Sequence, residues 1–142
     1  MGLNIVLAAP TGRAAKRMSE LTGMEAQTVH RLLGMTWNEA AHQVTFQKTE
    51  KEPLETEAVI VDEMSMVDVS LFSALLRALR PGTRWCWWRC GPAALRGPRQ
   101  RAGDILRSGA VDSVTLTEVF RQAEQSAIIR SAHAVNRARP RT

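Results

Sequence analysis

The sequence is poor in cysteine and contains no long apolar run. Its 142 residues include two cysteines, too few for a disulfide-stabilised scaffold, and this favours a reducing compartment. No apolar stretch approaches the length needed to cross a bilayer, and the amino terminus lacks the basic region of a secretory signal. We therefore expect a cytoplasmic protein with no membrane segment, of a length that suits one domain.

A second absence concerns phosphate binding, because the chain contains no Gly-Lys-Ser or Gly-Lys-Thr. One of these sequences ends the loop that holds nucleotide phosphates in many ATPases, and its lysine neutralises phosphate charge. Any nucleotide chemistry of this chain must therefore use other residues.

Acidic residues are absent from 84–101, which holds five arginines and accounts for the whole net charge of +5. Three tryptophans, Trp85, Trp87 and Trp88, lie in the same stretch. Basic and aromatic side chains together can bind a single nucleic-acid strand by charge attraction and base stacking. The alternative is that this stretch is anomalous, so the net charge says little about partners.

Apolar runs alternate with amphipathic segments along the chain, which indicates an α/β fold with a parallel sheet flanked by helices. Capping residues set the helix bounds: Thr11 and Asp68 can begin helices, and Gly23 can end one in which Leu21 shares the apolar face. The predicted strands are 3–9, 58–61 and 113–116, the predicted helices follow Thr11 and Asp68 or span 28–33 and 126–137, and a small β-hairpin is predicted over 35–51.

Two carboxylates, Asp62 and Glu63, follow the buried run at 58–61 directly. Ligands of open α/β sheets bind beyond the carboxyl ends of the strands. Asp62 there could hold a nucleotide-bound magnesium ion, and Glu63 could orient or deprotonate the attacking water. The alternative is an acidic strand end that only caps the following loop.

A glycine turn joins the first predicted strand to the first predicted helix, at Pro10, Thr11 and Gly12. The free N–H groups of such a helix N-terminus suit a phosphate, and Arg13 and Lys16 could follow a nucleic-acid backbone. The same cations could equally form a solvated helix face.

An arginine, Arg121, follows the predicted strand at 113–116. It could reach the charge that develops on a γ-phosphate. From spacing alone, a surface ion pair is the simpler interpretation.

Taken together and in this order, these segments resemble the RecD-like superfamily 1 DNA helicases, the exodeoxyribonuclease V alpha-subunit type. Residues 9–15, Ala-Pro-Thr-Gly-Arg-Ala-Ala, are similar to motif Ia, and 28–34, Thr-Val-His-Arg-Leu-Leu-Gly, to the segment that follows it. Residues 61–68 are similar to motif II and 116–122 to motif IV. The resemblance covers nearly the whole chain except 85–102.

The resemblance implies an ATP-driven 5′-to-3′ translocase of DNA recombination and repair, with RecA-like P-loop NTPase domains. Motif Ia, here Pro10, Thr11 and Gly12, would contact single-stranded DNA. Asp62 would hold Mg²⁺, Glu63 would act as general base and Arg121 would touch the γ-phosphate of ATP. The hairpin at 35–51 would help to split the duplex at a junction. Its Trp37 is assigned to packing within the hairpin.

Two family elements have no counterpart in the sequence, namely the phosphate loop and the second motor domain. We therefore expect residues 1–142 to be a partial first motor domain that is inactive without the remainder of the helicase. The alternatives are a non-catalytic nucleic-acid-binding module and an inactive gene remnant.

Residues 85–102 depart from the family pattern, which places an apolar strand and then Gly-Asp-x-x-Gln-Leu-Pro here. Tryptophan has a single codon, so the sequence Trp-Cys-Trp-Trp at 85–88 requires the bases TGG-TGY-TGG-TGG. Read one base earlier, these bases encode Leu, Met or Val followed by Val-Leu-Val, which is such a strand. We hypothesise that 85–102 is frame-shifted, through sequencing error or gene decay, which resequencing decides. We expect it to be disordered or poorly packed, because the replaced strand is buried on both faces.

Overall fold

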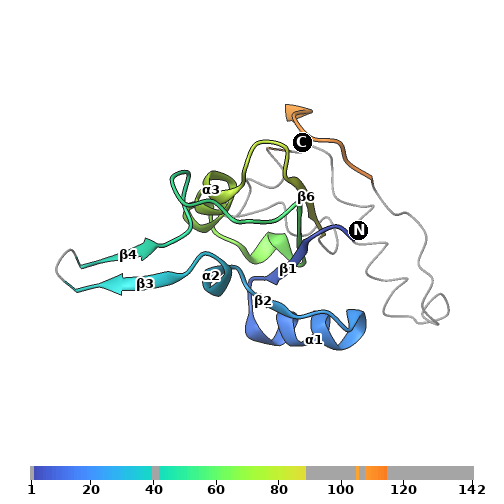
Figure 1. Ribbon diagram of the computed structural model, residues 1–142, viewed down its shortest axis with the longest axis horizontal. Coiled ribbons are helices and arrows are strands. Elements are labelled where there is room, and N and C mark those ends of the chain that lie inside the picture. Colours follow the sequence, from blue (N-terminus) through green and yellow to red (C-terminus); the bar gives the residue numbers. More distant parts are fainter. Residues whose placement is uncertain (1, 40–41, 89–104, 106–107, 115–142) are drawn as a thin grey trace, which may run out of the picture. The chain divides into compact units, whose positions relative to one another are not determined.

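The computed structural model describes residues 2–39, 42–88, 105 and 108–114 (Figure 1). The chain divides into two compact units, Met1–Cys90 and Gly91–Thr142. The helices and strands whose bounds follow all belong to the first unit. Within the described ranges, no helix is both long enough and apolar enough to cross a membrane.

The sheet of the first unit consists of four parallel strands, which confirms the predicted α/β class. In spatial order they are β2 (Ala26–Thr28), β1 (Ile5–Ala9), β5 (Ala58–Val61) and β6 (Arg84–Trp87). The two apolar runs of the sequence form the adjacent strands β1 and β5, where Ala8 pairs with Val61. Strand β2 was not predicted, because three residues, Ala-Gln-Thr, are too few to show a periodicity.

Helices cover both faces of this sheet (Figure 1). Helix α1 (Gly12–Thr22) lies on one face, and α2 (Val29–Leu32) and α3 (Val69–Ala78) lie on the other. The predicted caps of α1 are confirmed, since the Thr11 hydroxyl accepts a hydrogen bond from the Ala14 N–H at 3.2 Å. Gly23 ends the helix in the left-handed conformation, with φ of 70°.

Leu21 is not part of the packed face of α1, contrary to the sequence prediction. Its side chain is 77% exposed, whereas Ala15 is buried. Leu21 lies in the last turn of the helix, which the described residues do not cover.

The main core lies between the sheet and the α2/α3 layer. Asp68 begins α3 as predicted, and Leu71 and Leu75 on its apolar stripe are buried. The side chains packed there are mostly aliphatic and come from both central strands, α2, α3 and the segment before β5: Ala8, Val29, Leu32, Leu33, Leu54, Val59, Val61, Met64, Leu71, Leu75 and Ala78.

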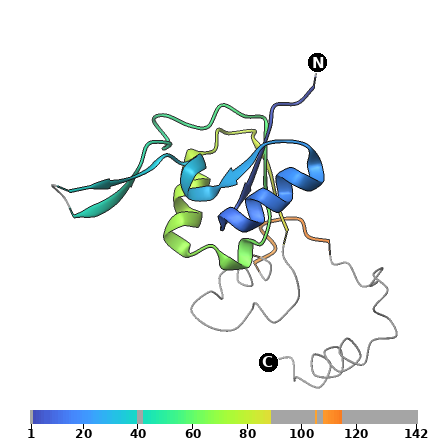
Figure 2. The same cartoon turned by 90° about the horizontal axis from the view of Figure 1, so that it is seen from below.

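The predicted hairpin is confirmed and projects away from the sheet in both views (Figures 1 and 2). It consists of the antiparallel strands β3 (Met35–Asn38) and β4 (Gln43–Phe46). Trp37 faces Val44 across the ladder, but it is 60% exposed. The assignment of Trp37 to packing within the hairpin is therefore wrong for most of its surface.

The expectation of disorder is wrong for the start of the suspect segment, because 84–87 form strand β6. Trp85 and Trp87 are half-buried on the face of α3. The Trp87 ring stacks on Phe72 with 5.6 Å between centroids and 18° between planes, and Trp85 meets Trp87 edge-on at 5.2 Å. Arg84 and Cys86, on the other face of β6, are exposed, so this strand is not buried on both faces and its tryptophans pack on one side only. Residues 89–102 lie outside the described residues.

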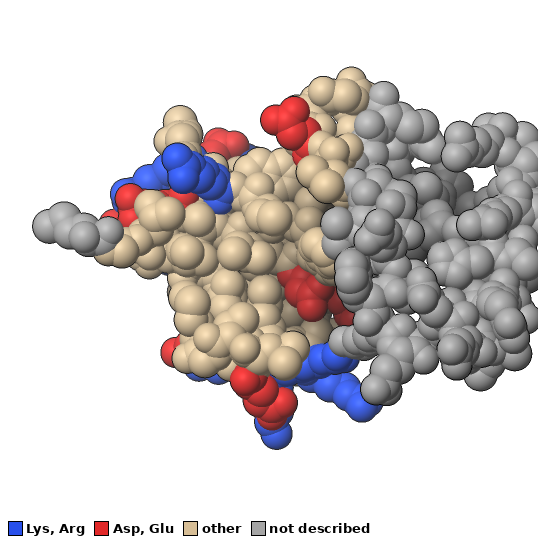
Figure 3. All heavy atoms as spheres, turned by 90° about the vertical axis from the view of Figure 1, so that its right-hand side faces the viewer, with Lys and Arg blue, Asp and Glu red and all other residues tan. Residues whose placement is uncertain are grey.

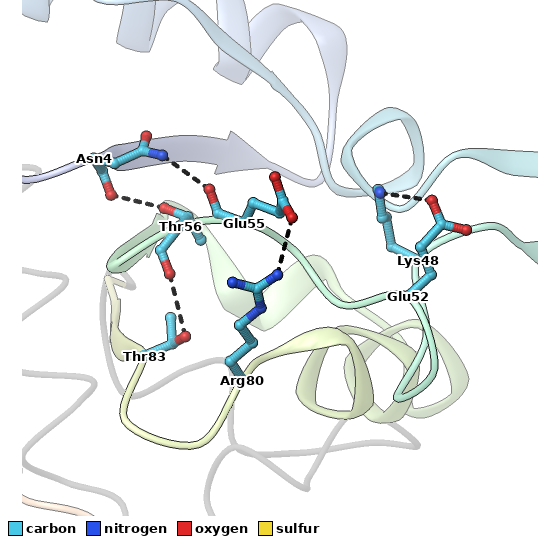
Figure 4. Close-up of polar contacts among 7 residues, drawn as sticks. All are labelled: Asn4, Lys48, Glu52, Glu55, Thr56, Arg80 and Thr83. Carbon is cyan, nitrogen blue, oxygen red and sulfur yellow. Dashed lines mark hydrogen bonds and ion pairs between the residues drawn. The ribbon is translucent and has the colours of Figure 1, made fainter.

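Polar contacts fasten the amino ends of the strands together (Figure 4). The Asn4 carbonyl accepts hydrogen bonds from the Thr56 hydroxyl at 2.8 Å and from the Glu57 N–H at 3.0 Å. The Thr83 hydroxyl donates to the Thr56 carbonyl at 3.3 Å, which links the start of β6 to the same group. Hydrogen bonds from backbone and hydroxyl groups therefore link the strands at their amino ends. The predicted functional residues lie at the opposite, carboxyl ends of the strands.

The strand predicted at 113–116 is absent from the part of it that the structure describes, residues 113–114. Ser113 and Val114 have no strand conformation, and Val114 is exposed. Residues 115–116 and the helix predicted at 126–137 lie outside the described residues.

Candidate functional site

The structure brings the two main sequence signals to one edge of the sheet. Pro10 follows β1 and Asp62 follows β5, at the carboxyl ends of two adjacent parallel strands. The Asp62 N–H donates to the Ala8 carbonyl at 3.0 Å, so Asp62 is level with the end of β1. The acidic pair and the glycine turn before α1 are therefore neighbours, in the position where open α/β sheets bind ligands.

Asp62 and Glu63 are held by the backbone turn that follows β5. The Asp62 carboxylate accepts a hydrogen bond from the Glu63 N–H at 2.8 Å, which fixes its orientation. Glu63 is exposed, and its backbone is left-handed, with φ of 49° and ψ of 40°. A left-handed conformation costs a non-glycine residue of the order of 1 kcal/mol or more, and such strain is common at functional sites.

Strand β6 also holds this turn, a contact that the sequence did not predict. The Met64 N–H donates to the Trp88 carbonyl at 3.1 Å, and the Trp88 N–H donates to the Val61 carbonyl at 2.8 Å. The backbone of residue 88 thus joins both sides of the Asp62–Glu63 turn. Only a parallel strand in the right register can make these bonds, so no residue type marks them in the sequence.

The predicted basic residues of this site lie on the first turns of α1. Arg13 and Lys16 are exposed on this helix, as the alternative of a solvated face requires. Lys16 lies 3.9 Å from Glu20, one turn further on. An exposed pair at this spacing contributes only a few tenths of a kcal/mol, so Lys16 remains available to an anionic partner.

The two carboxylates form no ion pair with any Lys or Arg of the described part of the chain. The described residues contain no group of three or more His, Cys, Asp or Glu side chains able to hold a metal ion. Mg²⁺ in nucleotide sites is usually held by one or two carboxylates plus substrate phosphates and water. Asp62 fits the carboxylate part of that donor set, with phosphate and water oxygens as the remaining ligands, and Glu63 lies beside it.

The third predicted site residue cannot be placed. Arg121 lies outside the described residues, as does the strand end expected to carry it. The structure therefore brings together Pro10, Thr11, Gly12, Asp62 and Glu63, with Arg13 and Lys16 on the adjoining helix.

Asp68 connects the acidic turn to the core helix α3. Its carboxylate accepts hydrogen bonds from the Leu71 N–H at 2.8 Å and from the Ser70 hydroxyl at 2.6 Å. These bonds hold the pKa of Asp68 below its ordinary value of 3.8, and the bond from the Leu71 backbone has the largest effect. Asp68, six residues after Asp62, thereby fixes the start of α3 at Val69.

Replacing this cap should destabilise the fold in a pH-dependent way. We expect Asp68→Ala to lower the free energy of unfolding by about 1 kcal/mol at neutral pH. Because folding lowers the pKa of Asp68, its ionised form contributes stability above the unfolded-state pKa, and this is lost as the pH falls through the folded-state pKa. Urea unfolding between about pH 7 and pH 3 measures both effects.

Asp68→Asn is the matched control, because asparagine caps helices about as well as aspartate but does not titrate. The difference between the wild type and Asp68→Ala should shrink on acidification, and the difference between Asp68→Asn and Asp68→Ala should not. A wild-type advantage that is the same at both ends of the pH range would contradict this account.

Comparison with known proteins covers the part of the chain that contains this edge. A family model described as an AAA domain matches residues 1–86, which include the whole edge described above. The chain is 38% identical over 136 residues to the ATP-dependent RecD2 DNA helicase of Deinococcus radiodurans, which covers 95% of this chain and 18% of the relative.

Two further relatives match shorter segments. The RecBCD enzyme subunit RecD of Mycolicibacterium smegmatis is 38% identical over 96 residues, with 56% of this chain and 17% of that protein covered. The ATP-dependent DNA helicase dda of Enterobacteria phage T4 is 40% identical over 86 residues, with 60% and 19% covered. The chain thus spans less than a fifth of the length of these relatives, and through residues 1–86 it belongs to the AAA domain family, in its RecD-like helicase branch.

Proposed function

We propose that the chain is part of the first motor domain of an ATP-dependent 5′-to-3′ DNA helicase of recombination and repair. The observation that carries this proposal is the sheet edge where the Asp62–Glu63 turn adjoins the Pro10–Gly12 turn. An acidic pair beside a helix N-terminus suits a metal-bound nucleotide close to an anionic strand. Similarity to RecD-type and dda helicases supports the same assignment.

The nucleotide chemistry in this proposal rests on three residues and on ATP with Mg²⁺. Asp62 would hold the ion, directly or through water, and the hydrogen bond that its carboxylate accepts from the Glu63 N–H keeps that carboxylate oriented. Glu63 orients or deprotonates the attacking water, which is consistent with its exposure and its fixed backbone. Arg121 would contact the γ-phosphate. Bound Mg²⁺ would neutralise charge on the phosphates.

The DNA contacts in this proposal come from α1 and from the hairpin. Pro10, Thr11 and Gly12 would contact single-stranded DNA, with Arg13 and Lys16 attracting its phosphates. The hairpin would meet the duplex at a junction. Strands β3 and β4 carry no Lys or Arg, so the hairpin would meet DNA through apolar and hydroxyl groups, including the exposed Trp37.

The 142 residues alone should not hydrolyse ATP, because they contain no phosphate-loop lysine. Neutralising phosphate charge is a large part of the catalysis of phosphoryl transfer. We propose that the remainder of a cytoplasmic helicase supplies the phosphate loop and the second motor domain. The frame-shift hypothesis for 85–102 remains part of this proposal.

A non-catalytic nucleic-acid-binding module is the second candidate, and the five arginines at 84–101 are the feature that favours it. The net charge of the described first unit does not favour a nucleic-acid-binding module, because residues 2–88 hold nine Lys and Arg against ten Asp and Glu. On the face shown in Figure 3, acidic and basic side chains lie in several small groups, some of which contain both signs, on a largely uncharged surface. An inactive gene remnant is the third candidate.

Charge removal on α1 tests the DNA contact. Arg13→Gln with Lys16→Gln should weaken the binding of a single-stranded oligonucleotide and reduce the salt dependence, by about 0.7 in log–log slope for each phosphate that is no longer neutralised. Fluorescence anisotropy over a range of salt concentrations measures both. Lys51→Gln is the control, because it removes an exposed cation from the loop after the hairpin.

Equal losses of affinity from Lys51→Gln and from the α1 pair would contradict a specific contact at α1. Salt-dependent binding that survives Asp62→Ala and Glu63→Ala, in a protein that shows no ATP hydrolysis in any longer form, would favour the binding module instead. No binding and no hydrolysis in any form would favour the gene remnant.

A further inference from the structure

The root of the hairpin has a steric feature that no other described glycine shares. Gly34 lies between α2 and β3, and its backbone is left-handed, with φ of 62°. A Cβ at Gly34 would lie 2.7 Å from Oε1 of Gln47, 3.0 Å from its Cβ and 3.1 Å from its Cδ. At the other described glycines an added Cβ meets nothing within 4 Å. Gly34 is therefore required both by its backbone conformation and by the contact with Gln47.

The hairpin is joined to the core at this point without a linker. The Gln47 N–H donates to the Gly34 carbonyl at 3.3 Å, and the Lys48 N–H donates to the Leu33 carbonyl at 3.0 Å. Leu33 is fully buried and Phe46 packs against the core. The two strands of the hairpin therefore leave the domain from fixed positions. Gly34, just before β3, and Gln47, just after β4, are in direct contact there.

The returning strand is also held after it leaves the hairpin. Lys48 pairs with Glu52 at 3.1 Å, and Glu50 pairs with Arg77 of α3 at 2.9 Å. These exposed pairs are weak individually, and only the Glu50–Arg77 pair ties the returning chain to another element. The end of the Gln47 side chain can turn away from an atom added at Gly34, but the Gln47 Cβ, at 3.0 Å, can give way only if β4 shifts relative to β3 by a few tenths of an ångström.

We propose that Gly34 is a positioning residue, whose close contact with Gln47 sets the direction in which the hairpin projects from the motor domain. This rests on the proposed function, in which the hairpin meets duplex DNA while α1 holds the single strand. A Cβ at Gly34 would lie 3.0 Å from the Gln47 Cβ, so a side chain there would push the two strand ends of the hairpin apart and change the angle of the hairpin to the strand-binding edge. Gly34→Ala changes that angle and leaves the contacts of α1 in place.

The geometric part is tested by a distance measurement on the whole chain. Spin labels at Glu39→Cys on the hairpin and Ser73→Cys on α3, in a Cys86→Ser, Cys90→Ser background, report the hairpin direction. Gly34→Ala should shift or broaden the distance distribution. Gly23→Ala is the matched control, because Gly23 has a similar φ of 70° but open space around it, and it should leave the distribution unchanged.

Rescue by a second substitution separates positioning from general damage. Gln47→Gly removes all three atoms that a Cβ at Gly34 would meet, so Gly34→Ala with Gln47→Gly should restore the wild-type distance distribution. A distribution unchanged by Gly34→Ala, or changed equally by Gly23→Ala, would overturn the proposal. Failure of Gln47→Gly to rescue would also overturn it, because the steric contact would not then be the cause.

The functional part is measured as the affinity for a forked duplex relative to that for its single strand. Gly34→Ala should remove the wild-type preference for the fork while single-strand affinity is retained, and the rescue variant should regain it. A fork preference unchanged by Gly34→Ala, despite a shifted distance, would overturn the positioning role. A wild-type chain without any fork preference would overturn the proposed function instead, while the distances still decide whether Gly34 sets the angle.

Discussion

Glu63→Gln should abolish ATP hydrolysis when residues 1–86 work in a complete motor. The substitution keeps the size of the side chain but removes the carboxylate that we propose orients or deprotonates water. General-base catalysis contributes about 10²–10⁴-fold to such rates, so kcat should fall by that factor. KM for ATP should change little, because the water-activating group acts in the transition state rather than in binding.

A chimera provides the complete motor. Residues 1–86 replace the matching segment of the Deinococcus radiodurans helicase, with which this chain shares 38% identity, and DNA-stimulated ATP hydrolysis is measured. Glu25→Gln, the same change at an exposed residue before β2, should leave the rate unchanged. The 142-residue chain alone should show no hydrolysis above background.

Three outcomes would contradict these expectations, and the second of them would contradict the assignment of Glu63 itself. Hydrolysis by the 142-residue chain that disappears in Glu63→Gln would show that no further phosphate loop is needed. A chimera that hydrolyses ATP equally well after the Glu63→Gln substitution would show that Glu63 is not the base. A chimera without any hydrolysis would show that residues 1–86 cannot replace the motor segment.

Leu33→Ala should cause a large loss of stability. Leu33 is fully buried in the core between α2, α3 and the sheet, and truncating such a leucine costs about 2–5 kcal/mol through reduced burial and the cavity left behind. Domains of this size are stable by only about 5–15 kcal/mol, so much of the total would be lost. The midpoint and slope of urea unfolding, followed by circular dichroism, measure the change.

Leu21→Ala is the matched control for this prediction, because it is the same chemical change at a side chain that is 77% exposed. It should change the free energy of unfolding by no more than about 0.5 kcal/mol. Similar losses of stability in both variants would mean that the core is not packed as described. A loss of stability in Leu33→Ala alone would support the described core packing and the attachment of the hairpin to that core.

The sequence by itself determined the elements whose signals are local. The apolar runs of β1 and β5, the caps Thr11 and Asp68 and the stop at Gly23 each follow from the chemistry of a few adjacent residues. The Asp62–Glu63 pair was placed at a sheet edge because a carboxylate directly after a buried strand must leave it at the carboxyl end. The hairpin was predicted by alternating side chains, a property of the strand itself.

Only the tertiary structure decided what depends on partners far along the chain. Strand β2 exists because β1 pairs with it, and β6 accepts tryptophans because Phe72 of α3 stacks on Trp87. Leu21 and Trp37 are exposed although their types suggested packing. The backbone bonds of residue 88 and the contact of Gly34 with Gln47 depend on register and on distance between segments. A linear sequence does not contain these distances, because they arise only when the strands and helices pack.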